Sequence, residues 1–161
     1  MRMYIKQKMW SFNEKFYVYD RDNEPQYFVE GKLFSFPKKF SFQDMNGNVL
    51  YEIKQVAWSL FPKFKIFKDN ELVAVVSRKA SFFSPKYEIS NLAWSVRGNI
   101  TGHEYTIYAG NYRLADISRA FFSMGDFYEI NIHDEEYAEL ILVVVIVIDE
   151  NISITRRSSI P

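Results

Sequence analysis

The two histidines are the side chains best suited to acid–base or metal chemistry, and each is followed by a carboxylate, in His103-Glu104 and His133-Asp134. A zinc-protease helix needs a second histidine four residues after the first. Ile107 occupies that position after His103, and the surrounding residues favour a strand. We therefore interpret His103 as a strand-end residue at a hairpin, and we expect His133 to form a local cap or ion pair.

General acid–base catalysis by carboxylates needs two of them in one cleft with separated pKa values. The chain has many carboxylates, but their spacing gives no sign of such a pair: Asp44, Asp116, Asp126, Glu129, Asp134, Glu135 and Glu136. It also has no cysteine, no phosphate-binding glycine loop and no nucleophile elbow. We expect no enzyme, no metal site and no cofactor. An enzyme would require a deep cleft that holds His103 or His133 beside a strongly perturbed carboxylate.

Basic residues form a more suggestive group, which lies in one hairpin and the connector after it: Lys63, Lys65, Lys68, Arg78, Lys79 and Lys86. Such a patch could hold an anionic lipid headgroup or an inositol phosphate, at about 1 kcal/mol per contact near a membrane. Asp69 and Glu71 interrupt the group, and lysine also protects exposed strands from aggregation. A solvated face is the alternative. Basic and acidic residues balance at 20 each, which argues against a nucleic-acid partner.

Aromatic residues make up 18% of the chain. Most stand at alternating positions of strand-like segments, so we interpret them as core packing rather than as a surface for stacking bases. Two connectors, Phe82-Phe83 and Phe121-Phe122, interrupt that pattern. If they are exposed, they could instead bind a protein partner.

An internal repeat organises these residues. The segment Phe64–Arg78 aligns without a gap to Tyr105–Arg119, and each is soon followed by Phe-Phe-Ser. Fainter copies begin at Phe16 and Phe40. Each copy has an aromatic and β-branched run, a turn rich in Asn, Asp or Gly, and a second run of the same kind, which is the pattern of a β-hairpin.

Counting these hairpins predicts the fold. Hairpins begin near five positions: Phe16, Phe40, Phe64, Tyr87 and Tyr105. An opening strand over Met3–Lys8 and a final strand from Phe127 bring the expected total to twelve strands, spread over about residues 3–132. Closing them into an antiparallel barrel removes the edges that aromatic strands would otherwise expose.

Such a barrel is too wide for strand side chains alone to fill it, since about eight strands is the limit for that. The segment Glu135–Glu150 contains the apolar run Leu140–Ile148 and is the candidate for the core. Its Val and Ile residues favour a strand, yet an enclosed and uniformly apolar segment can also be a helix. The run is shorter than the roughly 20 apolar residues of a membrane-spanning helix, and charges flank it. Glu135, Glu136, Asp149 and Glu150 are expected at its polar ends.

Six stretches of the chain resemble the bacterial branch of the LURP-one-related (LOR) family: Lys6–Lys8, Tyr27–Lys32, Ser41–Asn48, Ile53–Gln55, Gly102–Tyr108 and Ala115–Ser118. That family belongs to the tubby C-terminal-like group and is related to the phospholipid scramblases. The resemblance implies a twelve-stranded barrel around a central hydrophobic C-terminal helix, here over about 135–149, with a short tail over 150–161. Tubby domains bind phosphoinositides, but no lipid-contact motif of theirs matches this chain residue by residue.

Taken together, we expect a single domain over residues 1–161 and a non-enzymatic binding or scaffold module. The expected ligand is an anionic lipid headgroup, and a protein partner is the alternative. Met1–Lys8 is charged and lacks the apolar run of a signal peptide, so a cytoplasmic protein is expected. We also expect a monomer.

Overall fold

The computed structural model describes residues 1–6, 15–32, 36–122 and 125–158. Within them lie a 3₁₀ turn, an α-helix and twelve strands: β1 (Arg2–Lys6), β2 (Lys15–Asp20), β3 (Pro25–Lys32), β4 (Lys39–Asp44), β5 (Val49–Gln55), β6 (Lys63–Lys68), β7 (Glu71–Lys79), β8 (Lys86–Ser90), β9 (Trp94–Asn99), β10 (Glu104–Ala109), β11 (Tyr112–Phe122), β12 (Gly125–Ile132), η2 (Glu135–Tyr137) and α1 (Ala138–Ser158).

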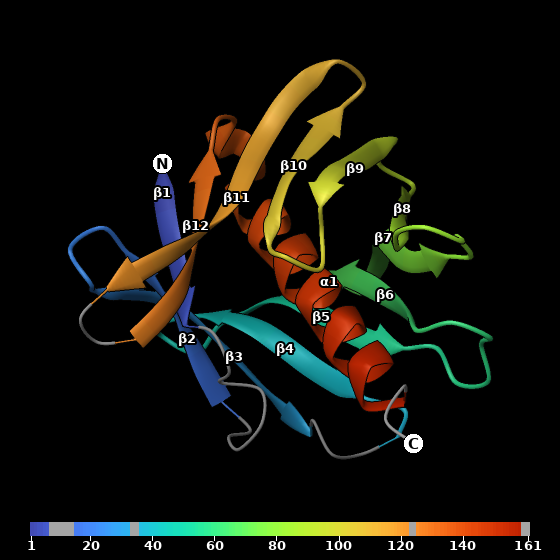
Figure 1. Cartoon of the computed structure of the whole chain (residues 1–161). Helices are drawn as coiled ribbons and strands as arrows, with labels where there is room; N and C mark the ends of the chain where they lie inside the picture. The colour runs from blue at the N-terminus through green and yellow to red at the C-terminus, as the bar shows by residue number, and fades with distance from the viewer. Residues whose placement is uncertain (7–14, 33–35, 123–124, 159–161) are drawn as a thin grey trace.

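The strands form one closed antiparallel barrel, in which each strand pairs with its neighbours in sequence and β1 closes the ring against β12 (Figure 1). The hairpins begin at β2, β4, β6, β8 and β10, each one residue before the position expected from the repeat. The predicted twelve-stranded barrel is therefore confirmed. Its regularity follows from alternation, because buried apolar residues recur at alternate positions along most of the strands and point into the lumen.

The turns have the geometry that their residue types predict. Asn23, Gly47, Asn70 and Gly110 all adopt positive φ angles, from 59° at Gly110 to 86° at Gly47. Gly, Asn and Asp tolerate this region of backbone space, and it gives tight hairpins the twist that matches their strands.

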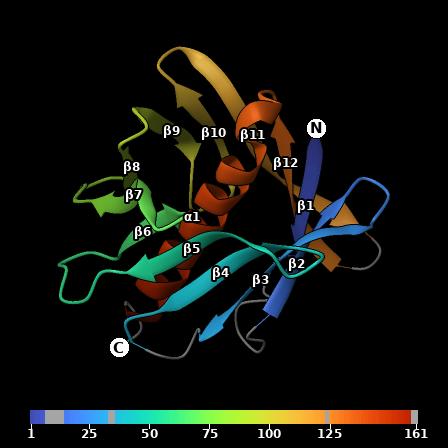
Figure 2. The same cartoon turned by 180° about the vertical axis from the view of Figure 1, so that it is seen from behind.

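Helix α1 runs through the lumen, with β4 and β5 behind it in Figure 1 and in front of it in Figure 2. Every residue from Leu140 to Ile148 is buried. Enclosure on all sides removes the apolar run from water, so burial outweighs the strand propensity of Val and Ile, and the helical alternative is confirmed. The helix is longer than expected, since it continues past Asp149 to Ser158. In the described residues, no helix combines the length and apolarity needed to cross a bilayer.

The barrel has two distinct ends. The helix enters beside the turns β2–β3, β4–β5, β6–β7 and β10–β11, and the Asp134 side chain caps η2 there by accepting a hydrogen bond from the Glu136 amide at 3.2 Å. It leaves at the other end, beside the connections β3–β4, β5–β6, β7–β8 and β9–β10. At this exit end, Arg156 of the helix donates to the carbonyl oxygen of Thr101 at 2.9 Å.

Candidate functional site

A row of lysines crosses the outer wall of the barrel close to its exit end. Lys39 of β4 lies directly opposite Lys54 of β5, and Lys54 lies directly opposite Lys65 of β6. Their sequence neighbours Phe40, Ile53 and Phe64 are buried, so the alternation of each strand directs these three lysines outward. We call Lys39, Lys54 and Lys65 the lysine row.

Few acidic groups neutralise this wall. Glu52 lies 3.7 Å from the Lys54 ammonium, and Glu88 lies 2.5 Å from that of Lys79, both at exposed positions. Among the described residues, no carboxylate comes within 4.0 Å of Lys39, Lys63, Lys65 or Lys86. Like charges directly opposite each other on neighbouring strands are destabilising. Within the lysine row, Lys54 has Glu52 nearby, whereas the charges of Lys39 and Lys65 have no carboxylate partner among the described residues.

The residues predicted from sequence divide into three groups. Lys63, Lys65, Lys79 and Lys86 lie on the outer wall at the exit end, with Lys79 directly opposite Lys86. Arg78 is on the lumen-facing side of β7, opposite buried Tyr87. Lys68 lies at the other end of the barrel, 5.3 Å above the ring of Tyr51, and does not join the rest.

Sequence reasoning missed Lys54 and the pairing of Lys39 with it. These residues are separated along the chain from the predicted cluster, and only the strand register places them beside Lys65. The available signal was the hairpin repeat itself, because aligning Phe40 with Ile53 across a tight turn brings Lys39 opposite Lys54.

Arg78 lines a shallow pocket of about 210 Å³ together with Phe61, Lys79, Ala80, Ser81 and Phe82. Its guanidinium carbon lies 5.7 Å from the centre of the Phe61 ring. Its Nε is buried and has no hydrogen-bond partner among the described residues. The pocket therefore contains a cation with unused hydrogen-bonding capacity.

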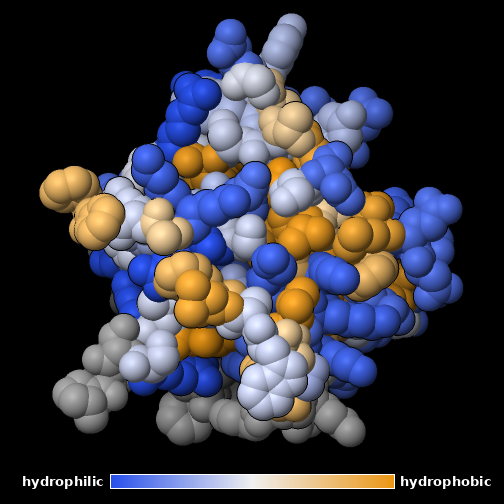
Figure 3. Space-filling model, turned by 90° about the vertical axis from the view of Figure 1, so that its right-hand side faces the viewer, coloured by the Kyte–Doolittle hydropathy of each residue, from blue (hydrophilic) through white to orange (hydrophobic). Residues whose placement is uncertain are grey.

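Large apolar side chains project from the connections at the same end. Trp58 and Leu60 in the β5–β6 connection are 93% and 91% exposed, and Phe82 and Phe83 in the β7–β8 connection are fully exposed. Figure 3 faces the side on which these two connections lie in Figure 1, and hydrophobic groups stand out there from a mainly hydrophilic surface. Phe82 and Phe83 therefore meet the condition of exposure that a protein-binding connector requires. The side chains of Phe121 and Phe122, at the end of β11, lie outside the described part of the structure.

Near the exit end, helix α1 places a charged residue, Glu150, inside the barrel. The Lys38 ammonium forms a short ion pair with Glu150, whose side chain is completely buried. Burial raises the pKa of Glu150, and Lys38 opposes this rise. The expectation that Glu150 is a polar end of the core segment is wrong, because the helix continues beyond it and leaves it inside the lumen.

His103 belongs to the same buried region. Its ring stacks on that of Tyr128 at 4.2 Å, and the Tyr128 hydroxyl donates to Asp149 at 3.3 Å. Burial lowers the pKa of His103 to about 4, and the positive charges of Arg156 and Arg119 add to this effect. A neutral, stacked imidazole in the turn before β10 agrees with the structural interpretation of this residue.

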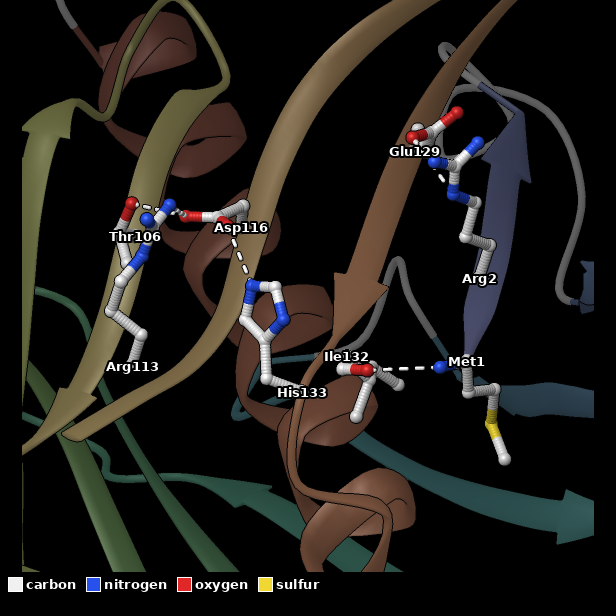
Figure 4. Close-up of polar contacts among 8 residues, drawn as sticks. All are labelled: Met1, Arg2, Thr106, Arg113, Asp116, Glu129, Ile132 and His133. Carbon is white, nitrogen blue, oxygen red and sulfur yellow. Dashed lines mark hydrogen bonds and ion pairs between the residues drawn. The ribbon is translucent and has the colours of Figure 1, made fainter.

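His133 pairs with Asp116 instead of with a carboxylate beside it in sequence (Figure 4). Its Nε2 lies 2.7 Å from Asp116, which also accepts hydrogen bonds from Thr106 and Arg113 at 2.6 Å. Burial raises the pKa of Asp116, but these hydrogen bonds outweigh it and hold the pKa at about 2. The expected local partner, Asp134, caps the 3₁₀ turn instead.

The structure places the two histidines in different surroundings. His103 is enclosed in the core, and His133 lies on the outer wall. Neither lines the Arg78 pocket or the second described pocket, at the helix-entry end beside Met1 and Glu135. Among the described residues, no group of three His, Asp or Glu side chains is placed to hold a metal ion.

The fold is that of a closed hairpin barrel built around a hydrophobic C-terminal helix, and its distinctive features are a cationic wall and an aromatic exit end. A crystal structure of an Arabidopsis thaliana protein shares this fold, with a TM-score of 0.63, 19% identity, and coverage of 93% of this chain and 90% of that one.

The model of the LURP-one-related family matches residues 1–149, and the chain belongs to that family. The uncharacterised protein YxjI of Bacillus subtilis (strain 168) is 33% identical over 149 residues, which cover 92% of each chain. The family resemblance inferred from the sequence is thereby confirmed.

Proposed function

We propose that this protein is a non-catalytic module that docks onto anionic phospholipid surfaces through the lysine row. The observation that carries the proposal is the direct cross-strand alignment of Lys39, Lys54 and Lys65 on the outer wall. Lysines near an anionic membrane contribute about 1 kcal/mol each to binding. Lys63 and Lys86 add to the same end of the barrel.

The main alternative explanation for surface lysines is protection of a sheet edge against aggregation. That explanation does not suit this wall, because β4, β5 and β6 are each hydrogen-bonded on both sides within a closed barrel. These strands have no open edge to protect. Placing like charges directly opposite one another also costs stability, which favours a role that benefits from concentrated positive charge.

A protein partner is the second candidate, and the exposure of Phe82 and Phe83 favours it. An interface formed by these residues would bury large aromatic area, which is typical of binding hot spots. It would not need the lysine row, so variants of the lysines distinguish the two functions.

The test is co-sedimentation of the purified protein with vesicles of phosphatidylcholine alone or mixed with phosphatidylserine or a phosphoinositide. We expect capture by the anionic vesicles and weaker capture of the Lys54→Gln/Lys65→Gln variant. The matched control is Arg21→Gln/Lys68→Gln, which removes the same charge from exposed residues at the helix-entry end. Equal capture of the two variants would contradict the role of the lysine row.

A further inference from the structure

We propose that the exit end of the barrel enters the interface of an anionic bilayer, with Trp58, Leu60, Phe82 and Phe83 among the headgroups and a lipid phosphate bound beside Arg78. This inference rests on the proposed function and assigns it a docking face, an orientation and a phosphate site.

The position of the exposed apolar residues supports this orientation. The β3–β4, β5–β6 and β7–β8 connections leave the barrel at the same end, because the strands alternate in direction. They carry Phe36, Trp58, Leu60, Phe82 and Phe83, and the rings of Phe36 and Trp58 lie 6.1 Å apart in an edge-to-face arrangement. At the helix-entry end, Tyr112 is 82% exposed, and the other exposed apolar residues there, such as Met45, Val49 and Leu72, are only about half exposed. Among the described residues, the four apolar side chains that are more than 90% exposed, Trp58, Leu60, Phe82 and Phe83, all lie at the exit end.

The positive charges around the exposed apolar side chains favour an anionic lipid surface as the partner. Lys39, Lys63, Lys79 and Lys86 occupy strand ends directly behind the aromatic connections. Trp and other aromatic side chains concentrate at membrane–water interfaces, and lysine can lay its apolar stem along the interface while its ammonium reaches the phosphates. The apolar side chains of the connections can therefore enter the bilayer interface while the lysines at the strand ends behind them contact the anionic headgroups.

The Arg78 pocket provides the place for a phosphate. It opens at the base of the β7–β8 connection, and Phe82 forms part of its lining. Arg78 brings a buried Nε that lacks a partner among the described residues, and guanidinium groups bind phosphate through paired N–H donors. Lys79 lines the pocket too, although its ammonium also contacts Glu88. When Phe82 enters the interface, a headgroup phosphate would lie level with Arg78.

A labelled cysteine tests the orientation. The chain has no cysteine, so Ser84→Cys in the β7–β8 connection and Met45→Cys at the helix-entry end can each be labelled at one site with an environment-sensitive nitrobenzoxadiazole dye. With vesicles of phosphatidylcholine and phosphatidylserine, we expect a blue shift and protection from an aqueous quencher for the Ser84→Cys label only. Equal responses at both positions would overturn the orientation.

Two further variants test the contacts. Phe82→Ser/Phe83→Ser is expected to lower the vesicle partition coefficient by about tenfold or more, since apolar area no longer leaves water, while Val49→Ser/Leu72→Ser leaves it unchanged. Arg78→Gln is expected to weaken capture several-fold, and unchanged capture would overturn the phosphate assignment.

The outcomes separate this inference from the proposed function. If anionic vesicles capture the unmodified protein but the label of the Ser84→Cys variant stays in water, this inference is overturned and the proposed function is retained. Phe82 and Phe83 would then be available to a protein partner. If anionic vesicles do not capture the unmodified protein, both proposals fail.

Discussion

Lys54 and Lys65 lie directly opposite each other on β5 and β6, and both side chains point away from the barrel lumen. Lys39 extends the same row on β4. Pairs of like charge at such positions weaken a sheet, whereas pairs of opposite charge strengthen it by about 0.2–1 kcal/mol. If the lysine row serves to bind anions, a substitution that removes the repulsion between its lysines should raise the stability of the protein and weaken its binding to anionic lipid.

The Lys65→Glu variant tests that trade-off. It places a carboxylate opposite Lys54, so we expect the free energy of unfolding to rise by as much as about 1 kcal/mol. Capture by phosphatidylserine-containing vesicles should fall at the same time. Denaturant unfolding measures the first quantity and co-sedimentation the second. A variant that is less stable than the unmodified protein would show that the wall has another structural role.

The buried pair Lys38–Glu150 should behave as a unit. Lys38→Met leaves the Glu150 carboxylate in the lumen without its partner, and we expect a loss of about 3–5 kcal/mol of stability. Adding Glu150→Leu should recover most of that loss, because no charge then remains buried. A double-mutant cycle by denaturant unfolding measures the coupling. Two single variants whose effects simply add would contradict the ion pair.

His103 should make stability depend on pH in the acidic range. Its pKa is about 4 in the folded protein, below the ordinary value of 6.5. The unfolded chain therefore binds the proton more readily, and stability present above pH 6.5 is lost as the pH falls toward 4. The difference of about 2.5 units corresponds to about 3 kcal/mol.

The His103→Asn variant is the matched control for this pH dependence. His103 has a φ of 57°, which Asn tolerates better than most residues. Unfolding between pH 7 and 4 should be less pH-dependent in the variant than in the unmodified protein. Identical slopes would show that His103 titrates normally.

Two glycines should respond very differently to alanine. A Cβ at Gly31 would lie 2.4 Å from the carbonyl oxygen of Lys39, so Gly31→Ala must push β3 and β4 apart. We expect it to cost more than about 2 kcal/mol. Gly47 has open space around it but a φ of 86°, so Gly47→Ala should cost about 1–2 kcal/mol from backbone strain alone. Thermal unfolding of the two variants would rank them, and the reverse order would contradict this account.

Much of the fold could be predicted from local patterns. The hairpin repeat predicted the starts of the five hairpins to within one residue and that of the final strand to within two, since alternation and turn residues are local properties. The end of α1 could not be predicted in this way. Glu150 and Asn151 are polar and therefore suggest the end of the buried segment, but the barrel encloses both of them. Lys38, which makes the burial of Glu150 possible, is far from it in sequence.

The candidate site was only partly visible in the sequence. Proximity along the chain identified Lys63 and Lys65, but it also included Lys68. Lys63 and Lys68 are the first and last residues of β6, so they lie at opposite ends of the barrel. Lys54 joins the site through cross-strand register alone. The pairing of His133 with Asp116 likewise depends on where β12 meets β11. Contacts between segments that are distant along the chain set these positions, so local sequence patterns cannot predict them.

The most direct test of the central claim is the salt dependence with which vesicles capture the unmodified protein. We predict capture by vesicles that contain phosphatidylserine at low ionic strength, a marked loss of capture at about 0.5 M salt because screening shortens the range of the lysine charges, and weak capture by pure phosphatidylcholine. Equal capture by neutral and anionic vesicles, or no capture by either, would contradict the proposal that this barrel docks onto anionic lipid.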